Sequence, residues 1–128
     1  MPRRRPFQRV DRLNRTILKV LGTAVTRESR EEILRSVTVT GVEVTRDLSL
    51  ARVYYYAPAE IREETITALN RALGFLRSRV GQEVRMRQTP ELRFIYDESI
   101  ERASRLESIL SDLDIQDEES DEDSDGAS

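Results

Sequence analysis

The sequence contains neither cysteine nor histidine. Without cysteine there is no disulfide framework and no thiolate to serve as metal ligand or nucleophile. Without histidine the commonest general base and zinc ligand is missing as well. The five glycines stand too far apart for either common phosphate-binding glycine loop. We therefore expect a protein that is not an enzyme and that uses no cofactor, no metal and no small-molecule substrate.

Long apolar runs are also missing. No stretch approaches the roughly eighteen consecutive apolar residues of a membrane span, and no signal-peptide pattern is present. These features predict a cytoplasmic protein without a membrane partner.

Charge is abundant and unevenly distributed. The chain has 21 basic and 24 acidic residues, and 8 of the acidic ones fall in residues 114–128. Residues 1–113 therefore carry all 21 basic against 16 acidic residues, a net charge of +5, and residues 114–128 carry −8. Because arginine binds phosphate bidentately and releases counterions, the basic part predicts a polyanionic partner.

The composition divides the chain into three parts. Residues 1–6 (MPRRRP) are predicted to be a basic flexible arm, residues 7–113 a single basic domain, and residues 114–128 a disordered acidic tail. The tail has three open interpretations: it keeps the protein soluble, it docks on a basic protein, or it folds back over the chain's own arginines.

The first predicted element is an amphipathic helix. Val10, Leu13, Ile17 and Leu21 recur at helical spacing, with arginines on other faces. Gly22 is either its end or an interior residue. Ser29 and Glu32 have the spacing of a capping box for a further short turn.

A hairpin follows. Val37 and Val39 share one face of a strand, and after Gly41 the parity shifts to Val42 and Val44, which predicts a β-bulge at the glycine. The segment TRDLS is typical of a turn, and the next strand alternates Ala51, Val53 and Tyr55 with Arg52, Tyr54 and Tyr56. Tyr54 and Tyr56 either stack on bases or lie half-buried in the sheet.

A second helix is predicted over residues 60–73, with an axis change at Gly74 that turns Phe75 inward and a C-terminal stop at Gly81. Three elements follow: a basic stretch (VRMR), a strand that contains Phe94, and a last helix that contains Leu106. The complete order is α, β, β, α, kink, α, β, α. This order predicts an α+β fold with helices packed on one face of a small three-stranded sheet.

The predicted bend is surrounded by arginines. Arg71 and Gly74 lie on the face opposite Leu73, and further arginines at 77, 79, 85 and 87 are close in sequence. A glycine at a bend lets a phosphate backbone approach closely, and a helix start offers free N–H groups. The spacing alone leaves two interpretations open: an RNA-binding elbow, or a packing kink that only buries Phe75.

Three stretches closely resemble the bacterial ribosome-binding factor A family: VTVTGVEVTRDLSLARVYYY, ALNRALGFLRSRVG and LRFIYDESIERASRLESIL. The resemblance implies a type II KH-like domain in which an Ala-x-Gly kink, here Ala72 to Gly74, joins a pair of helices. It also implies a monomeric assembly factor for the free small ribosomal subunit (30S). Such a factor supports late maturation of 16S rRNA, including its 5′-end processing, and growth in the cold.

The residues that we expect to contact rRNA combine the basic arm, the first helix, the bend and the following basic stretch. They are Arg3, Arg4, Arg5, Arg9, Arg12, Arg71, Ala72, Gly74, Arg77, Arg79, Arg85 and Arg87. Two other functions remain open at this point: a general RNA chaperone without ribosomal preference, and a protein-interaction adaptor that uses the sheet edge or the acidic tail.

Overall fold

The structure, a computed structural model, describes the backbone of residues 6–125 and the side chains of residues 9–113. It divides into two units, of which the first ends at Asp97 and the second begins at Glu98. Arg3, Arg4 and Arg5 lie outside the described residues. Of the predicted flexible arm, residues 1–6, only Pro6 is described, and it is the first residue of a helix.

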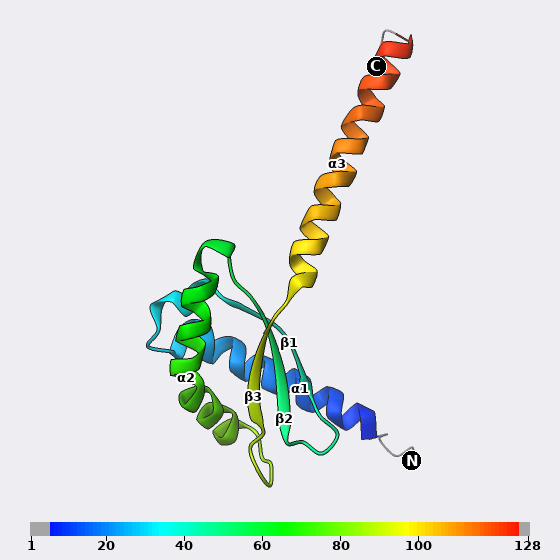
Figure 1. Ribbon diagram of the computed structural model, residues 1–128. Helices are drawn as coiled ribbons and strands as arrows, with labels where there is room; N and C mark the ends of the chain where they lie inside the picture. The colour runs from blue at the N-terminus through cyan, green and yellow to red at the C-terminus, as the bar shows by residue number, and fades with distance from the viewer. Residues whose placement is uncertain (1–5, 126–128) are drawn as a thin grey trace. The chain divides into compact units, whose positions relative to one another are not determined.

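The first unit has helices on a three-stranded sheet, so the predicted α+β, KH-like fold class is confirmed (Figure 1). In chain order its elements are α1 (Pro6–Thr23), the π-helical turn η1 (Ala24–Glu28), the 3-10 turn η2 (Glu32–Ser36), β1 (Thr38–Val44), β2 (Leu50–Tyr56), the 3-10 turn η3 (Ala59–Ile61), α2 (Arg62–Glu83) and β3 (Glu91–Tyr96).

Helix α1 has the predicted apolar stripe. Ile17, Leu21 and the following Ala24 are fully buried. Gly22 lies in the last turn of α1 but does not stop the chain from being helical, since α1 continues to Thr23 and η1 follows directly. The predicted capping box does not form: Ser29 Oγ accepts the backbone N–H of Glu31, at 3.0 Å, two residues on rather than three. Residues 24–36 are thus a compact connection of tight turns between α1 and β1.

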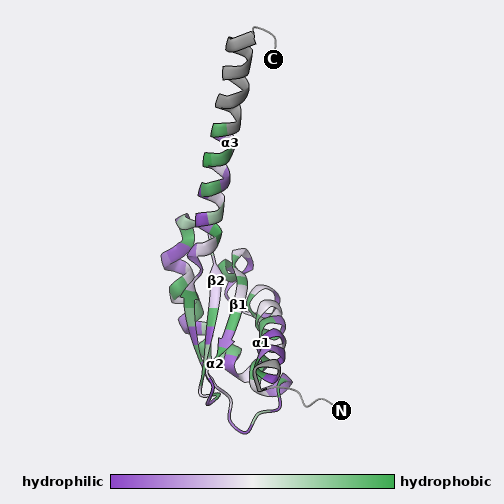
Figure 2. Ribbon diagram, turned by 90° about the vertical axis from the view of Figure 1, so that its right-hand side faces the viewer, coloured by the Kyte–Doolittle hydropathy of each residue, from purple (hydrophilic) through white to green (hydrophobic). Residues whose placement is uncertain are grey.

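The sheet has the order β1-β2-β3, with β1 antiparallel to β2 and β2 parallel to β3. The register of β1 against β2 shifts between Val39 and Gly41, which confirms the predicted bulge. Because of that shift, Val42 lies opposite Val53 and on the apolar face of the sheet. Figure 2 shows hydrophobic segments in β1 and β2 and hydrophilic segments along α1.

The core lies between this apolar face and the two helices, with α1 against β1 and α2 against β3. Ala51 and Val53 are fully buried, and Tyr55 is nearly so, as the alternation in the sequence predicts. Tyr55 packs edge-to-face on Phe94 and Tyr96 of β3, with ring centroids 6.3 Å and 5.7 Å away. Burial of these apolar groups is the main favourable term for the fold.

Helix α2 corrects the predicted helix pair. Residues 62–83 form one α-helix, which continues through Gly74 and passes Gly81 to end at Glu83. Its buried face is Thr65, Ala68, Leu69, Ala72, Leu76 and Val80. Phe75 does not turn inward but keeps 40% of its surface exposed, and Ile66 is exposed as well. Glycine permits a break at low cost but does not enforce one, and nothing in the core requires Phe75.

The second unit is one long helix, α3 (Glu98–Asp125). Its large apolar side chains are exposed, namely Ile100, Leu106, Ile109, Leu110 and Leu113. The helix includes residues 114–125 of the predicted disordered tail. No proline or glycine interrupts the chain there before Gly126, so local sequence does not oppose helical backbone.

Candidate nucleic-acid interface

The arginines of α2 are engaged within the protein. Arg79 is held most firmly: Nε donates to Glu28 Oε1 at 2.9 Å, and Nη1 donates to Gln82 and Glu83 at 2.9 Å and 3.2 Å. The hydrogen bond to Glu28 is the largest cause that raises the Arg79 pKa above its ordinary value. Arg71 donates through Nε to Glu31. Glu31 and Glu28 come from segments 40 and 51 residues earlier in the chain than their arginine partners.

Arg77 has a different role. Its Nη2 donates to the Thr89 carbonyl at 3.0 Å and its Nε to the Pro90 carbonyl at 3.3 Å. The loop between α2 and β3 is therefore fastened to the helix by a guanidinium group. Gly81 stands beside the same loop, where a Cβ would lie 2.9 Å from Thr89 Oγ1. This close approach favours glycine at that position.

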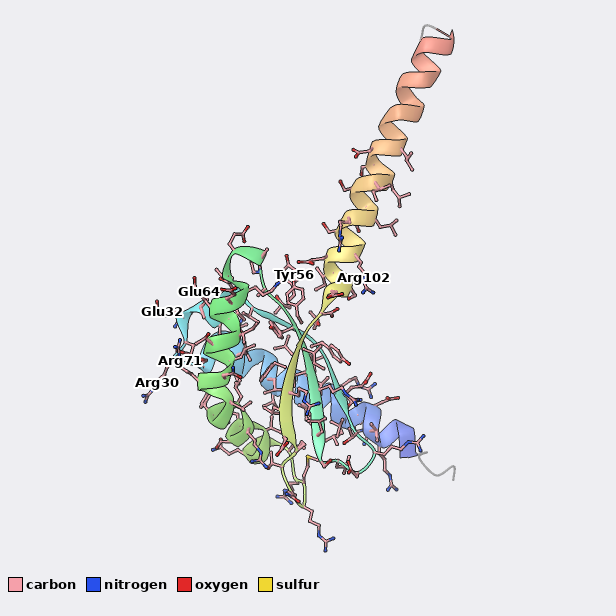
Figure 3. The ribbon with its side chains drawn as sticks, in the orientation of Figure 1. Arg30, Glu32, Tyr56, Glu64, Arg71 and Arg102 are labelled. Atoms are coloured by element: carbon pink, nitrogen blue, oxygen red, sulfur yellow. The ribbon has the colours of Figure 1, made fainter. Side chains whose placement is uncertain are left out.

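A cavity of about 480 Å³ opens between α2 and the turns that follow α1. Figure 3 shows Arg71 on α2 and Arg30 on those turns close to each other. The residues that line this cavity include acidic, basic and apolar side chains. They are Glu28, Ser29, Arg30, Glu31, Arg71, Ala72 and Phe75. The predicted ring of cations around the bend is thus wrong, because glutamates distant in sequence fold against it.

The two non-cationic residues of the predicted site differ in exposure. Ala72 is 6% exposed and belongs to the core. Gly74 is partly exposed, and a Cβ built on it would meet nothing within 4 Å. A backbone of another molecule therefore has open access to Gly74, and the protein itself leaves room for a side chain there.

A second group of arginines comes together elsewhere in the first unit. Arg9 of α1 and Arg85 and Arg87 of the α2–β3 loop line a cavity of about 540 Å³, and all three keep solvent-exposed surface. Among the described residues none of the three has an ion pair. We call these three residues the loop cluster. The remaining lining residues are Leu13, Asp47, Leu48, Ser49, Met86 and Gln88.

Asp47 is the carboxylate among the lining residues that the structure describes in this cavity. It accepts hydrogen bonds from Thr45 Oγ1 and Ser49 Oγ, both at 2.8 Å, and from Ser49 N at 3.1 Å. These bonds, first that of Thr45, lower the Asp47 pKa below its ordinary value. Asp47 therefore stays ionised and fixes the β1–β2 turn, and three arginines against this one carboxylate leave the described lining with a net positive charge.

Other predicted residues lie apart from both cavities. Arg12 is exposed on α1 and lines neither one. Tyr54 and Tyr56 are half-buried, and the Tyr56 ring lies 6.1 Å from that of Tyr96, so base stacking by them stays a prediction. Leu48, Met86 and Gln88 were not among the predicted site residues. The turn segment TRDLS contains Leu48, and the basic stretch VRMR contains Met86, so the sequence did point to both parts of the chain.

Within the described residues no set of three or more histidine, cysteine or acidic side chains is placed to hold a metal ion. None of the helices between residues 6 and 125 has the length and apolarity that crossing a membrane requires. What the site offers is a solvent-facing surface of guanidinium groups, apolar side chains and one open glycine, which suits binding rather than bond cleavage.

Comparison with known proteins gives a family match. Residues 9–110 match the family described as ribosome-binding factor A. The crystal structure of ribosome-binding factor A from Thermus thermophilus superposes with a TM-score of 0.62 and 29% sequence identity, over 68% of this chain and 94% of that one.

Two further structures are similar. A homology model of the Thermus thermophilus ribosome binding factor A, fitted into a cryo-EM map of its complex with 30S, has a TM-score of 0.55 and 26% identity, and covers 68% of this chain and 93% of that one. The solution structure of a Thermotoga maritima protein, a putative ribosome binding factor A, has a TM-score of 0.49 and 27% identity, over 70% and 83% of the two chains.

Proposed function

The chain belongs to the ribosome-binding factor A family, and from that premise we propose that it binds the free small ribosomal subunit and assists late maturation of 16S rRNA. The family consists of ribosome-binding factors and not of enzymes, so the chain acts by binding. The observation that carries the proposal is the match over residues 9–110. The relative from Thermus thermophilus, which is fitted into a map of a 30S complex, supports 30S as the partner.

The rRNA contacts in this proposal are electrostatic, with Gly74 added for close approach. The loop cluster contributes most, because its guanidinium groups have no ion pairs among the described residues. Arg71 contributes through the N–H groups that Glu31 leaves free, since its side chain is 64% exposed. Of the predicted contacts the proposal keeps nine: Arg3, Arg4, Arg5, Arg9, Arg12, Arg71, Gly74, Arg85 and Arg87. Ala72 is left out because it lies in the core, and Arg77 and Arg79 because their N–H groups bond within the protein.

Maturation of rRNA requires no chemistry from this chain. An immature rRNA has competing pairings of similar energy, and a protein that binds one of them more tightly shifts the population toward it. A hundredfold preference corresponds to about 2.7 kcal/mol, enough to turn an even mixture into an almost pure one. In this proposal the chain does not cut the 5′ end of 16S rRNA itself. It favours the rRNA conformation that a separate nuclease then processes. We propose that the chain acts in the cytoplasm and as a monomer. Its action is needed most in the cold, because incorrect rRNA base pairings separate slowly there.

A second candidate function is that of a protein-interaction adaptor. The exposed apolar side chains of α3 favour it, since a helix with Leu106, Ile109 and Leu110 at 50–56% exposure offers contact area for a partner protein. The acidic residues that follow would suit a basic ribosomal protein. Deletion of residues 114–128 tests the part that this segment has. If the affinity for rRNA is unchanged, the segment does not take part in RNA binding and serves either another partner or solubility.

Sedimentation through a sucrose gradient tests the proposal. We expect the protein to travel with free small subunits and not with translating ribosomes. If about five phosphates are neutralised, the logarithm of the affinity falls against the logarithm of salt with a slope of about −3 to −5. Migration with all ribosomal particles alike would favour a general RNA chaperone, and a slope near zero would contradict electrostatic binding.

A further inference from the structure

The cavity of the loop cluster is more than a patch of charge. Leu13 from α1, Leu48 from the β1–β2 turn and Met86 from the α2–β3 loop add apolar surface to the three arginines. Its volume of about 540 Å³ falls within the range of cavities that hold a small ligand. A lining that combines apolar side chains with three arginines suits a ligand that has both a flat apolar part and an anionic part.

Leu48 has a conformation that a leucine rarely adopts. Its φ is 62°, in the left-handed region, and it is the one non-glycine residue with positive φ among those described. The turn around it is well formed: Leu48 N donates to the Thr45 carbonyl at 2.9 Å, and Thr45 N donates to the Leu50 carbonyl at 2.9 Å. Glycine or asparagine is the usual residue at such a position, because Cβ crowds the backbone there.

The strain at Leu48 is not offset by burial of its side chain. That side chain is 38% exposed and does not belong to the hydrophobic core. A strained residue at an exposed position is a reason to look for a function outside the fold. Here the side chain lines the same cavity as Met86, together with Arg85 and Arg87.

We propose that this cavity binds one unstacked nucleotide of single-stranded RNA. The faces of the base pack against Leu48 and Met86, and the flanking phosphates pair with Arg9, Arg85 and Arg87. The side-chain amide of Gln88, which both donates and accepts, is placed among the lining residues to bond the base edge. The proposal rests on the proposed function, since it names the RNA feature that this part of the surface selects.

Single-stranded RNA fits the cavity better than duplex RNA. A base within a duplex is stacked on both faces and its edge is paired, so it cannot enter an apolar pocket, whereas an unpaired base can be turned out. The phosphates on either side of an extruded base also suit arginines that come from two different elements, α1 and the α2–β3 loop. The site therefore favours an unpaired segment of an incompletely folded rRNA.

Leu48→Gly in the full chain provides the test, because glycine relieves the strained φ while it removes the apolar contact. We expect the melting temperature to stay the same or to rise by up to about 5 °C. Affinity for small subunits and for a short single-stranded oligonucleotide should fall about tenfold, with the slope against salt unchanged, since no phosphate contact is lost. Binding to a duplex of the same sequence should not change.

Two variants serve as controls. Leu48→Asn also suits a positive φ and should behave like Leu48→Gly. Ile66→Ala removes an exposed apolar side chain from α2, outside the cavity, and should bind as the wild type does.

The failures of the two proposals are distinguishable. If the wild type does not bind small subunits, the proposed function is wrong. Suppose instead that the wild type binds small subunits, and that folded Leu48→Gly binds small subunits and the single-stranded oligonucleotide as tightly as the wild type does. Then the nucleotide site is wrong and the proposed function stands. A fall in affinity that is equal for single strands and duplex would also overturn the nucleotide site.

Discussion

The two groups of arginines differ in what their charges are used for. On α2, Arg77 and Arg79 direct their N–H groups to carbonyls and carboxylates of the same chain. In the loop cluster, Arg85 and Arg87 have no ion pair among the described residues. The first group holds the fold and the second is available to a partner. A count of arginines near a motif therefore does not give the charge that a ligand meets.

The largest expected effect comes from removing charge from the loop cluster. In Arg85→Ala/Arg87→Ala, the affinity for small subunits should fall by about ten- to a hundredfold near physiological salt, and the salt slope should become shallower by about two. Because neither guanidinium group has an ion pair within the described structure, the melting temperature should stay unchanged. Arg79→Ala is the matched control on α2 and should leave the salt slope unchanged, because Arg79 bonds to Glu28, Gln82 and Glu83 of the same chain. If Arg79→Ala reduced binding more than the double variant, the assignment of the two groups would be reversed.

Gly74 tests whether α2 also approaches RNA closely. Gly74→Val should fold, since a Cβ at this position meets nothing within 4 Å, and should bind small subunits about tenfold more weakly because the side chain keeps a phosphate backbone away. Gly74→Ala should raise the stability of the helix by about 0.5–1 kcal/mol and weaken binding less. Thermal melts of both variants measure the stability, and titrations with small subunits measure the affinity. Wild-type affinity in both would restrict RNA contact to other parts of the surface.

Arg77→Ala sharpens the comparison because it links the two groups. Loss of the bonds to the Thr89 and Pro90 carbonyls should lower the free energy of unfolding by about 1 kcal/mol and free the α2–β3 loop. Binding should fall only a fewfold, through poorer placement of Arg85 and Arg87. Faster amide hydrogen exchange in residues 84–89 would show the loosening. Unchanged exchange there would mean that the guanidinium does not hold the loop.

The smallest expected effect is the response of the β1–β2 turn to acid. The Asp47 pKa is lowered in the folded protein, so the stability it confers is present above the ordinary value of 3.8 and is lost as the pH falls below it. Asp47→Asn should remove this pH dependence. Backbone NMR shifts of residues 45–49, followed from about pH 6 to about pH 2, are the measurement. A turn that titrates equally in the variant would show that another group is responsible.

Parts of the fold could be predicted from the sequence because they are set locally. The parity shift at Gly41 and the alternation through Tyr55 come from the two-residue period of a strand, and both are found. Phe75 was predicted wrongly for a physical reason: the prediction expected a bend at Gly74, and glycine permits a bend without enforcing one. The helix continues through Gly74, and Phe75 keeps 40% of its surface exposed.

The site could be predicted only in part. The arginines are visible in the sequence, but their partners are not, since Glu28 meets Arg79 across 51 residues. Likewise, the meeting of Arg9 with Arg85 depends on how α1 and the α2–β3 loop lie in the folded unit. The positive φ of Leu48 was also unpredictable, because TRDLS offers no glycine or asparagine to mark it.

The most direct test of the account is residue-level mapping of ultraviolet crosslinks between the full chain and rRNA in the bound small subunit. We expect crosslinks in the β1–β2 turn around Leu48 and in the α2–β3 loop around Met86. Crosslinks found only on the α2 surface around Arg79, or to ribosomal proteins and not to RNA, would contradict it.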